Sequence, residues 1–248
     1  MIAPAAAVLG LVIGSFLNVV IHRVPRRSSV MWPASSCPQC GQPIAPKDNI
    51  PLVSYLLLRG RCRKCGERIP MRYPLIEALT AILFGAAGYE FGFSIQLISA
   101  LVLISALISL AAIDLEHGLL PNAIVAPCAA VGFVLSVLGD PTNWWIYLLS
   151  ILAVGGGLLA LALVFPAGMG MGDVKMGGML GAFLGPYGAL AVFLGALSGT
   201  IVGGLLLAVG RIRRRSPLPF GVFMAFGGLV TLFEGPELFA LYLRLVGV

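Results

Sequence analysis

Apolar residues occupy most of the chain in long stretches, whereas polar residues gather in one segment near the start and in short turns. A helix needs about 20 apolar residues to cross a bilayer. Residues 1–21 satisfy this requirement, and residues 22–73 form a polar, arginine-rich segment. Further candidate spans cover residues 74–90, 91–113, 119–139, 144–166, 176–210 and 218–233. The pattern predicts a first membrane helix, a polar domain and then a multi-helix membrane domain over residues 74–248.

Two apolar stretches leave the number of crossings open. Residues 176–210 carry no charge, and they are too long for one comfortable span. Gly185-Pro186 is a natural break within them, because proline interrupts a helix. The tail from Leu238 is short and contains Arg244, so it either crosses the membrane or lies at its surface. We expect an all-α polytopic membrane protein with about eight transmembrane helices. No internal repeat is apparent.

Composition and charge support this class. Charged residues make up 10% of the chain, whereas a soluble domain carries about 25%. The net charge is +6, with ten of the sixteen Lys and Arg within residues 23–72 and four more within residues 211–215. Basic residues next to membrane helices favour the cytoplasm, so we assign both clusters to that side. The basic balance therefore indicates a lipid bilayer and no nucleic acid.

The orientation follows from alternating crossings. With residues 22–73 in the cytoplasm, residues 211–215 come out on the same side without adjustment. Asp114 and Asp173 are placed there too, each at a membrane boundary. No positive charge precedes residues 1–21, so we expect a permanent span with its N-terminus outside rather than a cleaved signal. The prediction is a multi-pass protein of a bacterial inner membrane with its site on the cytoplasmic side.

The polar segment contains two CxxC pairs, and their spacing is typical of a metal site. Cys37 and Cys40 form the first pair, and Cys62 and Cys65 form the second. Four thiolates close a tetrahedral shell, so the spacing predicts a structural Zn²⁺ that supplies folding energy to residues 22–73. Disulfides or free thiols are alternatives, although a reducing cytoplasm disfavours disulfides.

Two aspartates stand out in the membrane domain. Asp114 follows an uncharged stretch, with Glu116 and His117 after it in an expected short turn. Asp173 follows three alternating glycines, which allow sharp bends and close approach of another chain. Two neighbouring carboxyls can share one proton, so that one acts as acid and the other as base on a water molecule.

Two other interpretations of these aspartates stay open. Asp114 caps a loop and Asp173 pairs with Lys175, or the carboxylates form a proton or cation relay in a transporter. A phosphate-binding loop is less fitting, because the glycine pattern lacks the Walker signature.

Segments along most of the chain resemble the prepilin peptidases, also called type IV leader peptidases. Each segment is short, but their order and spacing agree with this family. The segments are residues 14–23 (GSFLNVVIHR), 37–40 (CPQC), 48–51 (DNIP), 58–62 (LRGRC), 69–77 (IPMRYPLIE), 120–122 (LPN), 170–175 (GMGDVK) and 218–221 (LPFG).

The resemblance implies an aspartyl protease of the GxGD type. Asp114 and Asp173 would share the acid and base roles, with Gly170 and Gly172 as the motif glycines, and Lys175 would position Asp173 or act as a snorkelling anchor. The implied substrates are prepilins and pseudopilins, cut at the cytoplasmic membrane edge. Residues 74–248 would form the peptidase domain.

The family is often bifunctional, which implies a second activity. Many members methylate the new N-terminus with S-adenosylmethionine, and the cysteine segment is linked to that activity. This chain keeps all four cysteines, so we expect both activities. Arg72 and Glu77 lie where the polar segment enters the membrane, and they contact substrate or donor, or else form a charge pair or anchor.

Overall fold

The computed structural model describes residues 2–37, 39–165, 169–211 and 218–246. The chain divides into two compact units, Met1–Leu97 and Ile98–Val248. The two units are described separately.

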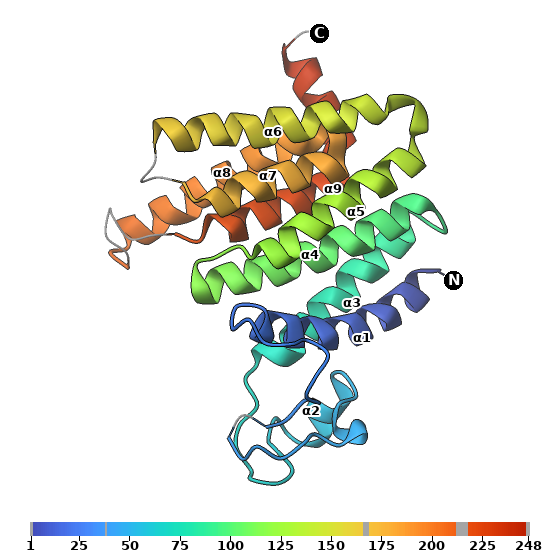
Figure 1. Cartoon of the computed structure of the whole chain (residues 1–248), viewed down its shortest axis with the longest axis vertical. Coiled ribbons are helices and arrows are strands. Elements are labelled where there is room, and N and C mark those ends of the chain that lie inside the picture. Colours follow the sequence, from blue (N-terminus) through green and yellow to red (C-terminus); the bar gives the residue numbers. More distant parts are fainter. Residues whose placement is uncertain (1, 38, 166–168, 212–217, 247–248) are drawn as a thin grey trace. The chain divides into compact units, whose positions relative to one another are not determined.

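In the first unit, two helices pack side by side (Figure 1). These are α1 (Ile2–Arg23) and α3 (Arg72–Glu90). Small residues permit the close approach: a Cβ added at Gly10 would lie 2.7 Å from the Ala81 Cα, and one at Gly14 would lie 2.8 Å from the Glu77 Cα. Glycine at such positions is typical of membrane helices, which gain stability from tight packing.

A small domain of turns connects α1 and α3, and we call it the cysteine domain (residues 24–71). It contains η1 (Pro46–Asp48) and α2 (Val53–Leu57). Isolated β-bridges join Ser36 to Pro43 and Arg61 to Arg68, and no longer strand occurs in the part of the domain that is described. The predicted polar segment of residues 22–73 overlaps this domain, but Arg23 ends α1 and Arg72 begins α3.

The second unit is a helical bundle. Its elements are α4 (Ile95–His117), α5 (Asn122–Gly139), η2 (Pro141–Asn143), α6 (Trp144–Val164), α7 (Met171–Leu184), η3 (Gly185–Tyr187), α8 (Gly188–Ala208) and α9 (Phe220–Val246). Helix α7 packs against α5, α6, α8 and α9, and all its residues from Met176 to Leu184 are buried (Figure 1). A Cβ at Gly181 would lie 2.6 Å from the Ser150 carbonyl oxygen of α6. The glycines of α7 therefore let its neighbours surround it closely.

The all-helical prediction is confirmed in type, but the number of spans is not. Six stretches of the described chain are long and apolar enough to cross a membrane, and α3 is not among them. One of the six, Met171–Ala208, contains the expected break, because η3 separates α7 from α8 at Gly185. Helix α9 continues from Phe220 to Val246 with Pro236 inside it. The expected span over residues 218–233 was therefore too short, and the tail belongs to the same helix.

Candidate functional site

Asp114 lies in the last turn of α4, and only 7% of its surface is exposed. The helix was expected to stop before this residue, but it continues to His117, so Glu116 and His117 are helical too. Gly118 ends it: this residue has a φ of +62°, and its N–H donates to the Asp114 carbonyl at 2.8 Å. Glycine adopts this left-handed conformation at little cost, which explains why the helix ends here.

Asp173 lies in the first turn of α7 rather than in a glycine loop. Its Oδ2 accepts a hydrogen bond from the Gly170 N–H at 3.0 Å, and its own N–H donates to the Gly170 carbonyl at 3.1 Å. This reciprocal pair is the carboxylate half of a capping box, and it fixes the Asp173 side chain at the helix start. Gly172 also lies within α7.

Lys175 does not form the expected ion pair with Asp173 in the part of the chain that is described. Its Nζ donates instead to the Asn122 Oδ1 at 3.0 Å. Because Asn122 begins α5, this bond joins the start of α5 to the start of α7.

The structure brings the two aspartates together within the second unit. Leu120 lies against both Gly172, the neighbour of Asp173, and Gly221, which lies against Asp114, so the two carboxyls are close enough to interact electrostatically. The Asp114 carboxyl also faces the first turn of α9, where a Cβ at Gly221 would lie 2.9 Å from its Oδ2. The backbone N–H groups of Gly221 and Val222 lie against this carboxyl, and its buried Oδ2 has no well-formed hydrogen bond from the described residues. A buried carboxyl oxygen in this position can hold a proton or accept a polar ligand.

Leu120 fills the space between the helix starts of this site. A Cβ at Gly172 would lie 3.0 Å from the Leu120 Cβ, and one at Gly221 would lie 2.9 Å from its Cδ2. We call Asp114, Leu120, Gly172, Asp173 and Gly221 the aspartate centre. Leu120, Asn122 and Gly221 were not predicted as site residues, although they lie in segments that carry the family resemblance.

The four expected thiols also come together, in the cysteine domain. The sulfurs of Cys37, Cys40, Cys62 and Cys65 all lie within 4.8 Å of one another, and the Cys37 and Cys65 sulfurs are 3.9 Å apart. Tetrahedral zinc with Zn–S bonds of about 2.3 Å requires sulfurs about 3.8 Å apart. The four thiols therefore fit a closed metal site.

Each cysteine pair folds into the same turn, which we call a knuckle. In the first, the Gly41 N–H donates to the Cys37 carbonyl at 2.9 Å; in the second, the Gly66 N–H donates to the Cys62 carbonyl at 2.9 Å. Both glycines have positive φ, +69° and +72°. Residues 37–44 and 62–69 share the pattern CxxCGxxI. The knuckles are thus an internal repeat, and the expectation of none was wrong.

Local contacts give the two thiols of the second knuckle different pKa values. The backbone N–H groups of Cys65 and Lys64 lower the pKa of the Cys62 thiol to about 7, which favours the thiolate that metals bind. Despite the backbone N–H of Glu67, desolvation and the neighbouring thiols raise the pKa of the Cys65 thiol to about 12. Arg63 donates to both carboxylate oxygens of Asp48 at 2.7–3.0 Å, and this pairing lowers the pKa of Asp48. The pair ties the second knuckle to η1.

Arg72 and Glu77 lie on α3 and have different surroundings. Glu77 is buried, and its Oε2 accepts a hydrogen bond from the Leu52 N–H at 2.8 Å. The Ser15 hydroxyl of α1 also bonds to this carboxyl. The Arg72 guanidinium lies over the Tyr73 ring, 5.1 Å from its centre. Glu77 thus joins the cysteine domain to both helices of the first unit.

Comparisons with known proteins agree with this division. Residues 8–91 match a family model described as the bacterial peptidase A24 N-terminal domain, and residues 101–208 match one described as the type IV leader peptidase family. No solved structure matches the chain.

Curated relatives are similar along almost the whole chain, and three of them are named prepilin leader peptidase/N-methyltransferase. The protein from Pseudomonas aeruginosa is 34% identical over 96% of this chain and 92% of its own length. The one from Bacillus subtilis is 36% identical over 96% of both chains. The one from Xanthomonas campestris pv. campestris is 37% identical over 99% of this chain and 96% of its own length.

Proposed function

Because the chain belongs to the type IV leader peptidase family, we propose that it cleaves the basic leader from prepilins and pseudopilins and then methylates the new N-terminus. The observation that carries the peptidase activity is the convergence of Asp114 and Asp173 at facing helix ends. Six stretches that could span a membrane support a membrane-embedded enzyme.

In the proposed reaction, the two carboxyls hold one proton between them. The ionised carboxylate removes a proton from a water molecule as the water oxygen attacks the scissile carbonyl carbon. The protonated partner then donates to the amide nitrogen as the C–N bond breaks, which leaves a carboxylic acid and a free amine. The burial of the Asp114 carboxyl supports sharing of a proton, because a buried site disfavours two negative charges side by side. Asp114 and Asp173 are interchangeable in this account.

Residues in and around the aspartate centre position the two aspartates. Gly170 fixes the Asp173 carboxyl through its N–H, and Lys175 holds α7 to α5 through Asn122. Gly172 and Gly221 leave room for Leu120 and the carboxyls. A carboxylate relay across a bilayer is not supported, because both aspartates lie in terminal turns and not in mid-helix.

We place the enzyme in a bacterial inner membrane with the aspartate centre on the cytoplasmic side and the N-terminus outside. The basic residues 23–72 and 211–215 support this orientation through the positive-inside rule. Prepilin leaders are basic and cytoplasmic, so cleavage at that boundary agrees with the position of the carboxyls at helix ends.

For the cysteine domain we propose a structural Zn²⁺ held by Cys37, Cys40, Cys62 and Cys65. The sulfur separations and the two knuckles support it. The methylation requires a donor, for which we propose S-adenosylmethionine; it would supply an electrophilic methyl group to the new amine.

The test is a reaction of purified protein in detergent with a prepilin and S-adenosylmethionine, followed by intact mass of the product. Loss of the leader together with one added methyl group is the expected result. Asp173→Asn runs alongside and should leave the prepilin intact. Cleavage at the wild-type rate by that variant would refute the assigned pair, and an unchanged prepilin with several substrates would refute the peptidase.

A further inference from the structure

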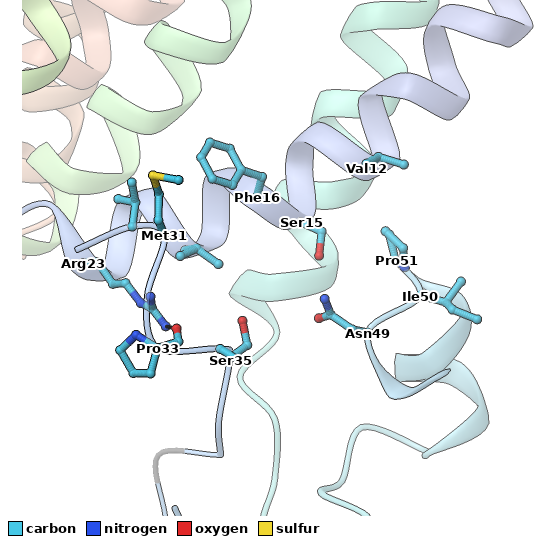
Figure 2. Close-up of a pocket in the computed structure, with 13 residues that line it drawn as sticks. Val12, Ser15, Phe16, Arg23, Met31, Pro33, Ser35, Asn49, Ile50 and Pro51 are labelled. Carbon is cyan, nitrogen blue, oxygen red and sulfur yellow. Dashed lines mark hydrogen bonds between the residues drawn. The ribbon is translucent and has the colours of Figure 1, made fainter. Parts of the chain in front are cut away.

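A cavity of about 500 Å³ lies in the first unit, beside the second half of α1 (Figure 2). Three separate segments line it: α1 from Val12 to Arg23, the loop of residues 30–35, and residues 49–51. The volume is within the range of small-molecule sites, about 300–1,000 Å³. Nothing described so far gives this cavity a role.

Three polar side chains point into the same space. Figure 2 shows the Ser15 and Ser35 hydroxyls and the Asn49 amide directed toward one another from α1, the loop and the segment before α2. The Ser15 hydroxyl is oriented by its bond to Glu77. A few fixed polar groups in a mostly apolar lining are typical of ligand sites, where they set the orientation of the ligand.

The wall of the cavity offers exposed apolar surface next to these polar groups. Phe16 is 49% exposed and Met31 is 88% exposed, and both line the cavity. An aromatic ring and a polarisable thioether are suited to the face of a planar base.

Arg23 lines the cavity, and only some of its N–H donors have partners within the protein. A guanidinium has five N–H donors, and here Nη1 donates to the Ser29 carbonyl at 2.9 Å while Nη2 donates to the Pro33 carbonyl at 2.8 Å. These two bonds hold the loop that forms the wall. The remaining donors suit a carboxylate.

We propose that this cavity binds the adenosyl methyl donor of the second activity, with the base against Phe16 and Met31, the ribose near Ser15, Ser35 and Asn49, and the amino-acid carboxylate at Arg23. The proposal rests on the proposed methyltransferase function and gives its donor a location.

A second cavity of the same unit provides the contrast. It has a volume of about 570 Å³ and is lined by Arg59, Arg61 and Arg68. S-adenosylmethionine carries a sulfonium and an ammonium against one carboxylate, so its net charge is positive. Three guanidinium groups would repel it. The first cavity has a single arginine, Arg23, enough to bind the one carboxylate, and it is therefore the better match.

The reaction at this site is a simple displacement. The unprotonated amine of the cleaved substrate attacks the methyl carbon, the carbon–sulfur bond breaks, and the sulfur keeps the bonding electrons. One product is the methylated ammonium, which releases a proton to water. The other is S-adenosylhomocysteine, whose sulfur carries no charge. No further oxidant or reductant is needed.

The test measures binding of S-adenosylhomocysteine to the full-length protein in detergent by calorimetry. Ala34 lines the cavity and is exposed, so Ala34→Phe places a ring in the ligand volume and should weaken binding at least tenfold. The matched control is Ser28→Phe, an exposed position two residues before this loop and outside the lining, which should leave binding unchanged. Asn49→Ala should weaken binding by a smaller factor.

Tryptophan fluorescence gives a second readout. Trp32 is 77% exposed and lies between two lining residues, Met31 and Pro33. In a Trp144→Phe/Trp145→Phe background it is the single tryptophan, and its emission should change on donor binding.

The outcomes separate the site from the function. Wild-type affinity in both Ala34→Phe and Asn49→Ala would overturn this site while the methyltransferase stands. Absence of both binding and methyl transfer in the wild type would overturn the function and the site together. Unchanged zinc content and leader cleavage in the variants verify that they are folded.

Discussion

The cysteine domain and the aspartate centre both gather side chains that are far apart in the sequence, but they do so by different means. Each knuckle closes through bonds between residues four or five positions apart, such as Cys37 to Gly41 and Gln42. Two finished knuckles then meet at four thiols. The aspartate centre is assembled instead from three helices, which supply Asp114, Asp173 and Gly221. Its geometry depends on how closely those helices pack.

This difference teaches where each site is vulnerable. A site made of preformed turns around a metal should respond to loss of the metal and tolerate changes elsewhere. A site made by helix packing should respond to added volume at the contact points, even where the added group is a single methyl.

The largest effect is expected for the carboxyls themselves. Asp114→Asn or Asp173→Asn should lower leader cleavage by at least about 10²-fold, because one partner of acid–base catalysis is lost. Zinc content should not change. Cleavage is measured by intact mass and zinc by elemental analysis. Asp140→Asn is the control, since Asp140 serves a turn through Thr142 and Asn143; it should retain activity, and equal loss there would point to a general folding defect.

Removal of the metal should divide the two activities. With Cys62→Ser or a strong chelator, we expect zinc to be lost and residues 24–71 to become sensitive to protease, because metal binding supplies folding energy to this small domain. Methylation should fail while leader cleavage persists. Zinc affinity should also fall as the pH drops, because protons compete with the metal for the four thiolates. Full methylation by a zinc-free protein would end the metal proposal.

An added methyl should harm the aspartate centre at one glycine and not at another. In Gly221→Ala the new Cβ meets the Asp114 Oδ2 and the Leu120 Cδ2, both at 2.9 Å. Overpacking costs about 1–3 kcal/mol, so cleavage should fall roughly tenfold to 100-fold. The control is Gly204→Ala in α8, where a Cβ meets nothing within 4 Å.

A second change sharpens the same prediction. Leu120→Ala removes the contact between the new Cβ and the Leu120 side chain. The Gly221→Ala/Leu120→Ala protein should therefore cleave the leader faster than the Gly221→Ala protein. If the Gly221→Ala protein cleaves the leader as fast as the Gly204→Ala protein, the close approach of α9 to Asp114 does not affect cleavage.

The smallest effect is expected at the bond between Lys175 and Asn122. Lys175→Met should slow cleavage by no more than about tenfold, since one hydrogen bond contributes about 0.5–1.5 kcal/mol. Asn122→Ala should have a similar effect, and the double variant should be no slower than either single one, because both remove the same bond. If the two substitutions instead slow cleavage additively, Lys175 acts through a partner other than Asn122, such as Asp173.

The sequence was sufficient to predict which side chains come together at both candidate sites, because each depends on residue types that are rare in their surroundings. Asp114 and Asp173 are conspicuous in apolar stretches, and two CxxC pairs are conspicuous anywhere. The end of α4 was missed by one turn, although Gly118 is a stop signal that could have extended the helix to His117. Gly221 could not have been placed at Asp114, since that contact depends on the packing of α9.

The number of membrane spans was harder to predict from the sequence, for a physical reason. Helix α9 carries Glu234, Pro236 and Glu237 in its interior, and each of these argues against a continuous span in the sequence. The structure nevertheless continues the helix past them. The repeat of the two knuckles was hidden because only the pattern CxxCGxxI is shared, while the side chains between those positions differ.

Because the two knuckles are separate in the sequence, they leave the ribosome one after the other. Cys37 and Cys62 are 62 − 37 = 25 positions apart, and ribosomes add about 5–20 residues per second. The first knuckle therefore leaves the ribosome roughly 1–5 s before the second. During that interval the nascent chain offers two thiols instead of four. The closed shell of the proposed zinc site would therefore be complete only when Cys65 emerges, shortly before α3 begins at Arg72.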